Sequence, residues 1–200
     1  MSLGHAFSLL VKPDRTWEAI RKDAEPVSKL YIGHILLLSL IPAAAGYYGS
    51  THVGWQIGDG PVIRLTATSA LQLTVLFYLA LLVGIYIIGR FIDFFSATYA
   101  VKGRQRFGTT LAAYAVTPVL LLGASAAYPH IWLNMFVGFI AIAYAVYLLY
   151  EGLPILMNIP EGRGFMFASS VLTVGLVMFV ALLAISVVIW SVGIGPVYTG

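Results

Sequence analysis

The sequence predicts an all-α fold: a polytopic membrane bundle of five transmembrane helices with a short N-terminal interfacial helix. Hydrophobic residues make up 60% of the 200 residues and charged residues only 10%, whereas about 25% of a soluble domain is charged. The mean hydropathy is +0.92, so the chain has too little polar surface to coat a soluble globule. Five apolar stretches are each long enough to cross about 30 Å of hydrocarbon.

The five stretches define the predicted domain organisation. Residues 1–28 form a cytoplasmic segment with the short amphipathic helix, residues 29–192 the transmembrane domain, and residues 193–200 an external tail. The predicted spans cover about 30–48, 69–89, 108–127, 131–150 and 167–190. These stretches are continuous, whereas barrel strands alternate apolar and polar residues over about ten positions. We therefore expect helices, which also satisfy their own backbone groups in lipid.

The distribution of Lys and Arg predicts the orientation. Ten of the eleven basic residues fall in the N-terminal segment or in the loops after the second and fourth spans. With five crossings these segments share one side, and Arg64 is the one basic residue on the other side. Cytoplasmic loops carry an excess of Lys and Arg. We therefore expect a multi-pass protein of the bacterial inner membrane, with a cytoplasmic N-terminus and a periplasmic C-terminus.

The segment Pro13–Arg21 predicts a short helix before the first span. Asp14 is a suitable N-cap, and Trp17 and Ile20 fall on one helix face. Two arrangements stay open at this point. The helix lies flat on the cytoplasmic leaflet, or it packs under the bundle.

The fourth span carries the strongest polar pattern. Tyr144, Tyr147 and Glu151 are spaced i, i+3 and i+7, which places them on one helix face. The segment Gly152–Pro154 follows as a helix breaker. Such a face suits a polar pocket or half of a proton or cation path, but an interfacial tyrosine belt with an exposed carboxylate is the favoured interpretation.

The third span contains Tyr114 and the pair Thr117 and Pro118. A proline inside a helix removes a backbone hydrogen bond, so it predicts a kink, and the Thr117 hydroxyl is available to a freed carbonyl. A kink of this kind either gates a transporter or shapes a bundle, and the sequence is compatible with both.

Three ionisable groups lie near the cytoplasmic ends of the first two spans. His34 lies about one turn inside the first span, where a half-immersed interfacial histidine is the favoured interpretation. Arg90 and Asp93 are three residues apart at the end of the second span. A boundary pair that stays together on one helix face or reaches the headgroups is the expectation for these two.

The sequence offers no enzyme or cofactor motif. There is no cysteine, which excludes disulfides, thiolate metal sites and cysteine nucleophiles. The HExxH, GxSxG and GxxxxGK[ST] motifs are absent. The charge pattern also lacks a basic nucleic-acid-binding face. We therefore expect neither catalysis nor a cofactor, metal or nucleic-acid partner.

Several short segments, dispersed in order over nearly the whole chain, share their residues with one family of membrane proteins. They are Lys12-Pro13-Asp14-Arg15, Gly54-Trp55-Gln56-Ile57-Gly58-Asp59-Gly60, Thr117-Pro118, Tyr147-Leu148-Leu149-Tyr150-Glu151-Gly152-Leu153-Pro154 and Asn158-Ile159. Each is a weak signal alone, and jointly they are fairly specific. On these residues the chain resembles the bacterial branch of the Yip (Rab-GTPase-interacting) family of five-pass membrane proteins.

The resemblance implies a five-helix fold with a cytoplasmic N-terminus. For the eukaryotic relatives it implies vesicle traffic and membrane shaping, with Rab GTPases among the partners. That role is not carried over, because this chain lacks their long N-terminal extension and bacteria have no Rab system. The bacterial branch supplies no agreed activity, so the resemblance assigns no catalytic residue.

Two functions follow as hypotheses. The first is a non-enzymatic membrane-organising or scaffolding protein whose partners are the lipid bilayer and, as open alternatives, other membrane proteins or further copies of itself. The second is a small transporter or channel for an ion, a proton-coupled solute or a lipid. The second requires the candidate polar residues to surround one cavity. These are His34, Arg90, Asp93, Tyr114, Thr117, Pro118, Tyr144, Tyr147 and Glu151.

Overall fold

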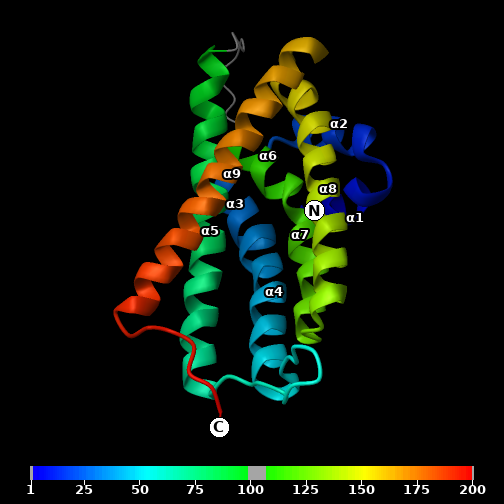
Figure 1. Ribbon diagram of the computed structural model, residues 1–200. Coiled ribbons are helices and arrows are strands. Elements are labelled where there is room, and N and C mark those ends of the chain that lie inside the picture. The colour runs from blue at the N-terminus through cyan, green and yellow to red at the C-terminus, as the bar shows by residue number, and fades with distance from the viewer. Residues whose placement is uncertain (1, 99–106, 200) are drawn as a thin grey trace.

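The computed structural model describes residues 2–98 and 107–199, and over these residues long helices run side by side along the molecule (Figure 1). The chain contains no strand there beyond two isolated bridges, Trp55 with Ile63 and Leu65 with Tyr198. The α-helices are α1 Ser2–Val11, α2 Pro13–Asp23, α3 Val27–Leu30, α4 Leu36–Tyr48, α5 Ala67–Thr98, α6 Gly108–Ala115, α7 Thr117–Leu122, α8 Ile131–Met157 and α9 Glu161–Ser191. Two π-helical turns, η1 Tyr31–Ile35 and η2 Gly49–Val53, and a 3₁₀ turn, η3 Gly123–Ala127, extend these helices.

Five helical units are long and apolar enough to cross a membrane, which confirms the predicted fold class. They cover Val27–Val53, Ala67–Ser96, Gly108–Ala127, Ile131–Met157 and Glu161–Ser191. The third unit is the central one, since half of its most apolar window is buried, whereas none of the corresponding window of the fifth is. The helix α9 therefore lies at the lipid-facing edge of the bundle.

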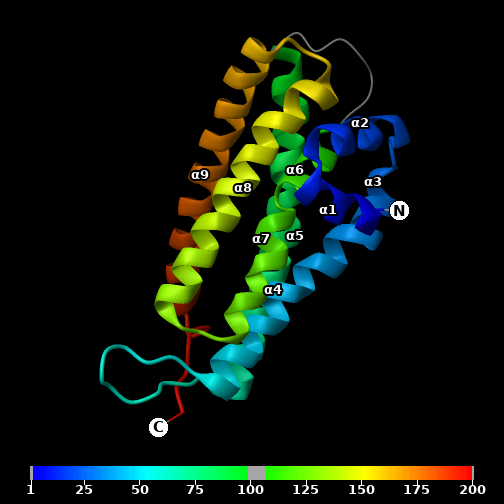
Figure 2. The same cartoon turned by 90° about the vertical axis from the view of Figure 1, so that its right-hand side faces the viewer.

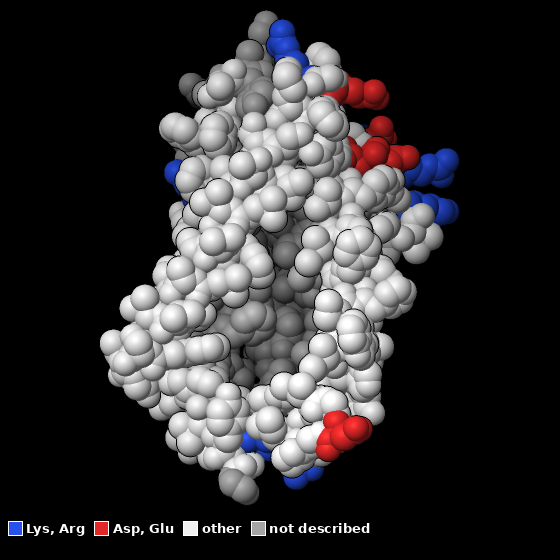
Figure 3. All heavy atoms as spheres, in the orientation of Figure 1, with Lys and Arg blue, Asp and Glu red and all other residues white. Residues whose placement is uncertain are grey.

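The two ends of the bundle differ in charge. We call the end that carries α1, α2 and the turn between α8 and α9 the basic end, and the end that carries the loop 54–66 and the C-terminal tail the opposite end. On the face shown in Figure 3, Lys, Arg, Asp and Glu gather at the two ends and leave an uncharged band between them. An uncharged band of long apolar helices is the surface that a protein presents to hydrocarbon.

Helix α8 corrects the predicted breaker at Gly152–Pro154. The helix continues through Pro154 and ends at Met157. A proline removes one hydrogen bond of the ladder, and neighbouring helices make this loss tolerable in membrane proteins. The true stop is Asn158, which adopts a left-handed conformation with φ of 51°. Asparagine accepts that conformation more readily than most residues, so it is a common helix terminator.

The N-terminal segment contains two helices, where the sequence predicted one. Helix α1 precedes the predicted helix, and α2 begins at Pro13, with Lys12 as the N-cap residue and Asp14 inside the first turn. The predicted Asp14 cap is therefore wrong. Proline fits the first helical position because its missing N–H would have no partner there anyway. The two helices fold against one another beside α6 and α8 (Figure 2).

Candidate functional site

Three of the predicted residues meet in the core of the basic end. The π turn η1 carries His34, and its Nε2 lies 3.1 Å from the Thr117 hydroxyl oxygen. The ring centroids of His34 and Tyr114 are 4.6 Å apart. All three side chains are buried. The prediction of a half-immersed interfacial histidine is therefore wrong, because α1 and α2 cover this end of the first span.

The break in the third span lies where the sequence predicted it. Helix α6 ends at Ala115 and α7 begins at Thr117, with Pro118 in its first turn. The Thr117 hydroxyl donates to the carbonyl of Ala113 at 3.1 Å, which confirms its predicted use of a local carbonyl. The same oxygen faces His34, so the kinked helix is fastened to the first span at the kink.

Two residues that the candidate set lacked close this cluster from the N-terminal side. The rings of His5 and Trp17 lie edge-on to Tyr114, with centroid distances of 6.4 and 6.3 Å. Trp17 is fully buried, and its ring lies over Gly152 of α8, where a Cβ would come within 2.6 Å of the Trp17 ring atom Cζ2. The apolar Trp17/Ile20 face was the available signal for this contact, and it favours the packed arrangement of α2 over the flat one.

The predicted face of α8 divides between α1 and α2. The Tyr144 hydroxyl donates to the carbonyl of Leu10 in α1 at 3.1 Å. Glu151 lies near Asp14 in the first turn of α2. Tyr147 is exposed and packs against Tyr144, with ring centroids 5.5 Å apart. Tyr144 therefore attaches α1 to α8, and Glu151 faces the start of α2.

A further contact fixes α2 across the end of α8. The Arg21 guanidinium donates to the carbonyl of Ile155 at 2.9 Å. The carbonyls of the last helical turn have no partner inside the helix and carry the negative end of its dipole. A cation at this position both pairs a carbonyl and complements the dipole. Sequence reasoning missed Arg21 because the two residues are 134 positions apart.

Arg90 and Asp93 have separate surroundings. The Asp93 carboxylate accepts a hydrogen bond from the backbone N–H of Gly108, the first residue of α6, at 2.9 Å. A carboxylate at a helix N-terminus satisfies an otherwise unpaired N–H and stabilises the helix dipole. Arg90 is exposed on α5. Asp93 thus joins the second span to the start of the third, and Arg90 lies on the surface.

A cavity in the other half of the molecule is lined by none of the nine candidates. It has a volume of about 460 Å³ and is lined by α4, α5, α7, η3 and α8. Its walls are apolar for the most part, with Ser50, Thr74, Ser125 and Asn134 as the polar side chains. This cavity therefore does not bring the candidate residues together.

The interactions at the basic end are contacts between helices. Over the residues that the structure describes, no three His, Asp or Glu side chains gather in a way that could hold a metal ion. Trp17 Nε1 and the Ser39 hydroxyl are buried without a hydrogen-bond partner, and they do not line the cavity. The site is a buried polar cluster beneath a helical cover, and the apolar cleft lies in the other half of the molecule.

The chain is similar in sequence to known membrane proteins. A family model described as the Yip1 domain matches residues 7–182. The inner membrane protein YohC of Escherichia coli strain K12 is 36% identical over 191 residues, which cover 96% of this chain and 98% of that protein. The YohC of a second Escherichia coli strain matches to the same extent. No solved structure matches.

Proposed function

The chain belongs to the Yip1-domain family of membrane proteins, and from that premise we propose that it is a non-enzymatic protein that organises the bilayer of the inner membrane or scaffolds other membrane proteins. One observation carries the proposal. Two of the candidate polar residues contact the N-terminal helices: Tyr144 donates a hydrogen bond to α1, and Tyr114 packs against Trp17 of α2. These two side chains therefore help to hold α1 and α2 against the bundle.

The fixed helix pair presents a surface suited to a lipid headgroup layer. Phe7 and Val11 of α1 are 62% and 76% exposed. Exposed Lys12 and Arg15 lie on the same shallow depression, between α1 and α2. Apolar side chains flanked by cations bind anionic leaflets, because burial of the apolar groups adds to attraction for the headgroups. In the proposed orientation this surface meets the cytoplasmic leaflet.

Lipid packing in proteoliposomes tests the proposal. Wild-type protein is reconstituted into phosphatidylethanolamine and phosphatidylglycerol vesicles, and a solvatochromic dye reports lipid order as the protein content rises. We expect a graded change in order that the double substitution Phe7→Ser, Val11→Ser largely removes. The matched control replaces with serine Ile57 and Val62, which are also exposed, at 66% and 52%, in the loop at the opposite end, and it keeps the wild-type response. Identical lipid order with and without protein contradicts the proposal.

The alternative, a small transporter or channel, is favoured by the cleft alone, whose 460 Å³ is within the size range of ligand sites. Proton flux into the same vesicles, read by a trapped pH-sensitive dye under a pH gradient, separates the two. We expect wild-type vesicles to match protein-free ones. A saturable flux that Glu151→Gln abolishes overturns the organising role and favours the transporter.

The proposed orientation, with a cytoplasmic N-terminus and a periplasmic C-terminus, has its own test. The chain contains no cysteine, so one introduced thiol reports its side of the membrane. Glu18 and Asp59 are exposed at the basic and opposite ends. A membrane-impermeant maleimide on intact cells is expected to label Asp59→Cys directly and Glu18→Cys only after permeabilisation. The reverse pattern inverts the topology.

A further inference from the structure

The cleft in the opposite half runs between the wall formed by α4 and α5 and the wall formed by α7, η3 and α8, and it opens to the side of the bundle. The hollow is visible in the lower half of the molecule (Figure 3). We propose that this cleft binds one acyl chain of a phospholipid from the leaflet at the opposite end. In the proposed orientation that leaflet is the periplasmic one.

The cleft exists because small residues line it and no helix closes it. Gly46 of α4 and Gly138 of α8 both line the cleft, and a Cβ on either would meet no heavy atom within 4 Å. Helix α9 leans away from α8 toward the opposite end (Figure 1) and contributes no lining residue. The space is therefore open to hydrocarbon and not blocked by the fold.

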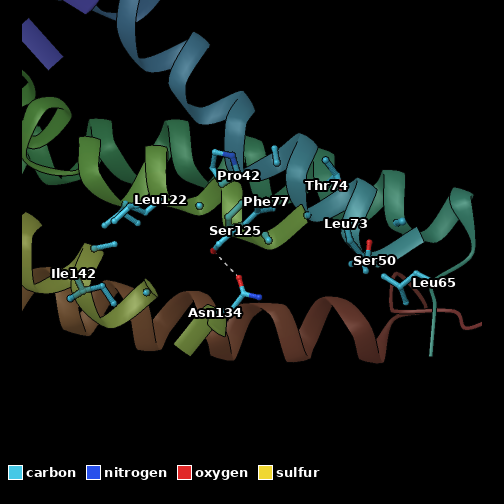
Figure 4. Close-up of a pocket in the computed structure, with 18 residues that line it drawn as sticks. Pro42, Ser50, Leu65, Leu73, Thr74, Phe77, Leu122, Ser125, Asn134 and Ile142 are labelled. Atoms are coloured by element: carbon cyan, nitrogen blue, oxygen red, sulfur yellow. Dashed lines mark hydrogen bonds between the residues drawn. The ribbon is translucent and has the colours of Figure 1, made fainter. Parts of the chain in front are cut away.

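The lining chemistry favours hydrocarbon over a polar solute. The Ser125 hydroxyl donates to the Asn134 side-chain oxygen at 2.8 Å (Figure 4), and the Asn134 amide donates to the Tyr128 carbonyl at 2.8 Å. The Ser50 hydroxyl donates to the Tyr47 carbonyl at 3.2 Å. Three of the four polar lining side chains are thus already bonded within the protein. A polar solute would lose its hydration and gain few partners, whereas an alkyl chain loses nothing.

The size of the cleft favours a chain over a partner helix. One turn of an α-helix, about 10 Å across and about 5.4 Å long, fills roughly 420 Å³. The whole cleft of about 460 Å³ therefore holds about one turn, which is too little for a transmembrane segment of another protein or of a second copy. A single alkyl chain is much narrower and can follow the cleft along its length.

The polarity along the cleft matches a lipid that enters from the opposite end. Ile142 and Leu122 lie at the end toward the middle of the bundle, and Ser50 and Leu65 lie at the other (Figure 4). The Leu65 N–H donates to the Ser50 carbonyl at 2.9 Å, which fixes its neighbour Arg64 at this end. Arg64 is the one Lys or Arg between residues 30 and 89. A phosphate there would find a cation at headgroup level.

Photolabelling tests the proposal. The probe is a phosphatidylglycerol with a diazirine in one acyl chain, present at low content in phosphatidylethanolamine vesicles that contain the full-length protein. Irradiation and peptide mapping then locate the labelled residues. We expect label on the cleft walls, in α4 and α8. The variants Gly46→Leu and Gly138→Leu fill the cleft with a side chain and are expected to lower that label by about tenfold or more.

Two glycines provide matched controls. Gly84 of α5 and Gly175 of α9 also have no heavy atom within 4 Å of a Cβ, but neither lines the cleft. Gly84→Leu and Gly175→Leu carry the same added volume and are expected to keep wild-type labelling. Arg64→Gln is expected to reduce labelling about two- to fivefold at low salt, the size of effect typical of an exposed charge pair.

Three results overturn the proposal. Equal labelling of cleft-filled and control variants means that the probe samples only bulk lipid around the bundle. Labels confined to the outward face of α9 mean that the cleft is closed in the bilayer. Protein–protein cross-links between α4 or α8 and a second polypeptide, lost on Gly138→Leu, mean that a helix occupies the cleft. Folding of each variant is checked by its elution as a single species in detergent.

Discussion

The basic and opposite halves of this bundle are built from the same helices and packed in opposite ways. At the basic end, Trp17, Tyr114 and His34 fill the space between α2, α6 and the first span, and the cover formed by α1 and α2 closes it. At the opposite end, glycines and alanines face one another across a cleft. Large side chains fill the interior of the basic half, whereas small side chains leave a cleft in the opposite half.

Helix α8 shows the difference within a single element. A Cβ at Gly152 would strike the ring of Trp17, whereas a Cβ at Gly138, four turns away, would meet nothing. One glycine allows a tryptophan to approach the backbone, and the other leaves room for something outside the chain. Glycine therefore lies at a close contact at one end of α8 and beside open space at the other, and only the neighbouring residues distinguish the two positions.

The largest expected effect on the unfolding free energy comes from removing the side chain of Trp17, which packs α2 against the bundle. Trp17→Ala empties a fully buried site between α2, Tyr114 and Gly152. We expect a loss of about 3–5 kcal/mol in unfolding free energy, measured by SDS titration of the purified protein in mixed micelles. The control is Trp132→Ala on α8, where the side chain is 75% exposed and a change within about 0.5 kcal/mol is expected. Equal effects of the two substitutions would contradict the conclusion that Trp17 holds the basic half together.

The next largest effect is expected from the two glycines of α8, Gly152 and Gly138, one in each half of the bundle. Gly152→Ala forces a methyl group into the Trp17 ring and is expected to cost about 1–3 kcal/mol. Gly138→Ala has free space and gains helix propensity, up to about 1 kcal/mol. The two variants are therefore expected to differ in unfolding free energy by roughly 1–4 kcal/mol in the same titration. A similar loss for both would show that the cleft is closed in the membrane.

A smaller effect is expected at the kink of the third span. Thr117→Val removes the hydroxyl that faces His34 inside the core, and we expect a loss of roughly 1–2 kcal/mol in unfolding free energy. Thr173→Val on α9 is the matched control, because its hydroxyl also donates to the carbonyl four residues earlier but is exposed. If the two valine variants are equally stable, the His34 contact contributes nothing.

The smallest effect concerns the surface of the cover. Arg21→Met deletes the hydrogen bond to the Ile155 carbonyl at the end of α8. The contact is exposed, so we expect a loss of only about 0.5–1 kcal/mol. Hydrogen exchange of α2 amides is the more sensitive measurement, and faster exchange in α2 with unchanged exchange in α6 is the expected pattern. Lys22→Met, next along the chain and exposed, is the control, and unchanged α2 exchange in the Arg21 variant would contradict the role of this bond.

Hydropathy alone predicted the five spans, because a bilayer accepts almost nothing but continuous apolar helices. The break at Thr117 and Pro118 was equally local, since proline lacks the N–H that a helix needs. The pairing of His34 with Thr117 was not predictable in this way. The two residues are 83 positions apart, and the π turn that carries His34 turns its ring inward by a rotation that no local pattern specifies.

The cleft was missed for another reason. It is defined by side chains that are absent, and a glycine such as Gly46 or Gly138 has the same signature in the sequence whether a neighbour approaches it or not. Similarly, the face formed by Tyr144 and Glu151 was identified as a unit, but its partners Leu10 and Asp14 lie in a segment whose extra helix was not predicted. Both the cleft and the neighbours of the α8 face depend on tertiary contacts, which the local sequence does not specify.

The hydrogen bond from Arg21 to Ile155 also orders the events of biogenesis. The donor leaves the ribosome first, and its acceptor follows 134 residues later. At about 5–20 residues per second, the delay is roughly 7–27 s. During that interval Gly152 has not yet been synthesised, so the indole of Trp17 lacks this contact. The helices α1 and α2 must therefore stay at the membrane surface or on a chaperone until α8 is made. The helices α1 and α2 thus complete their docking only after α8 has been made, and in a nascent chain arrested before α8 the side chain of Trp17 lacks its contact with Gly152.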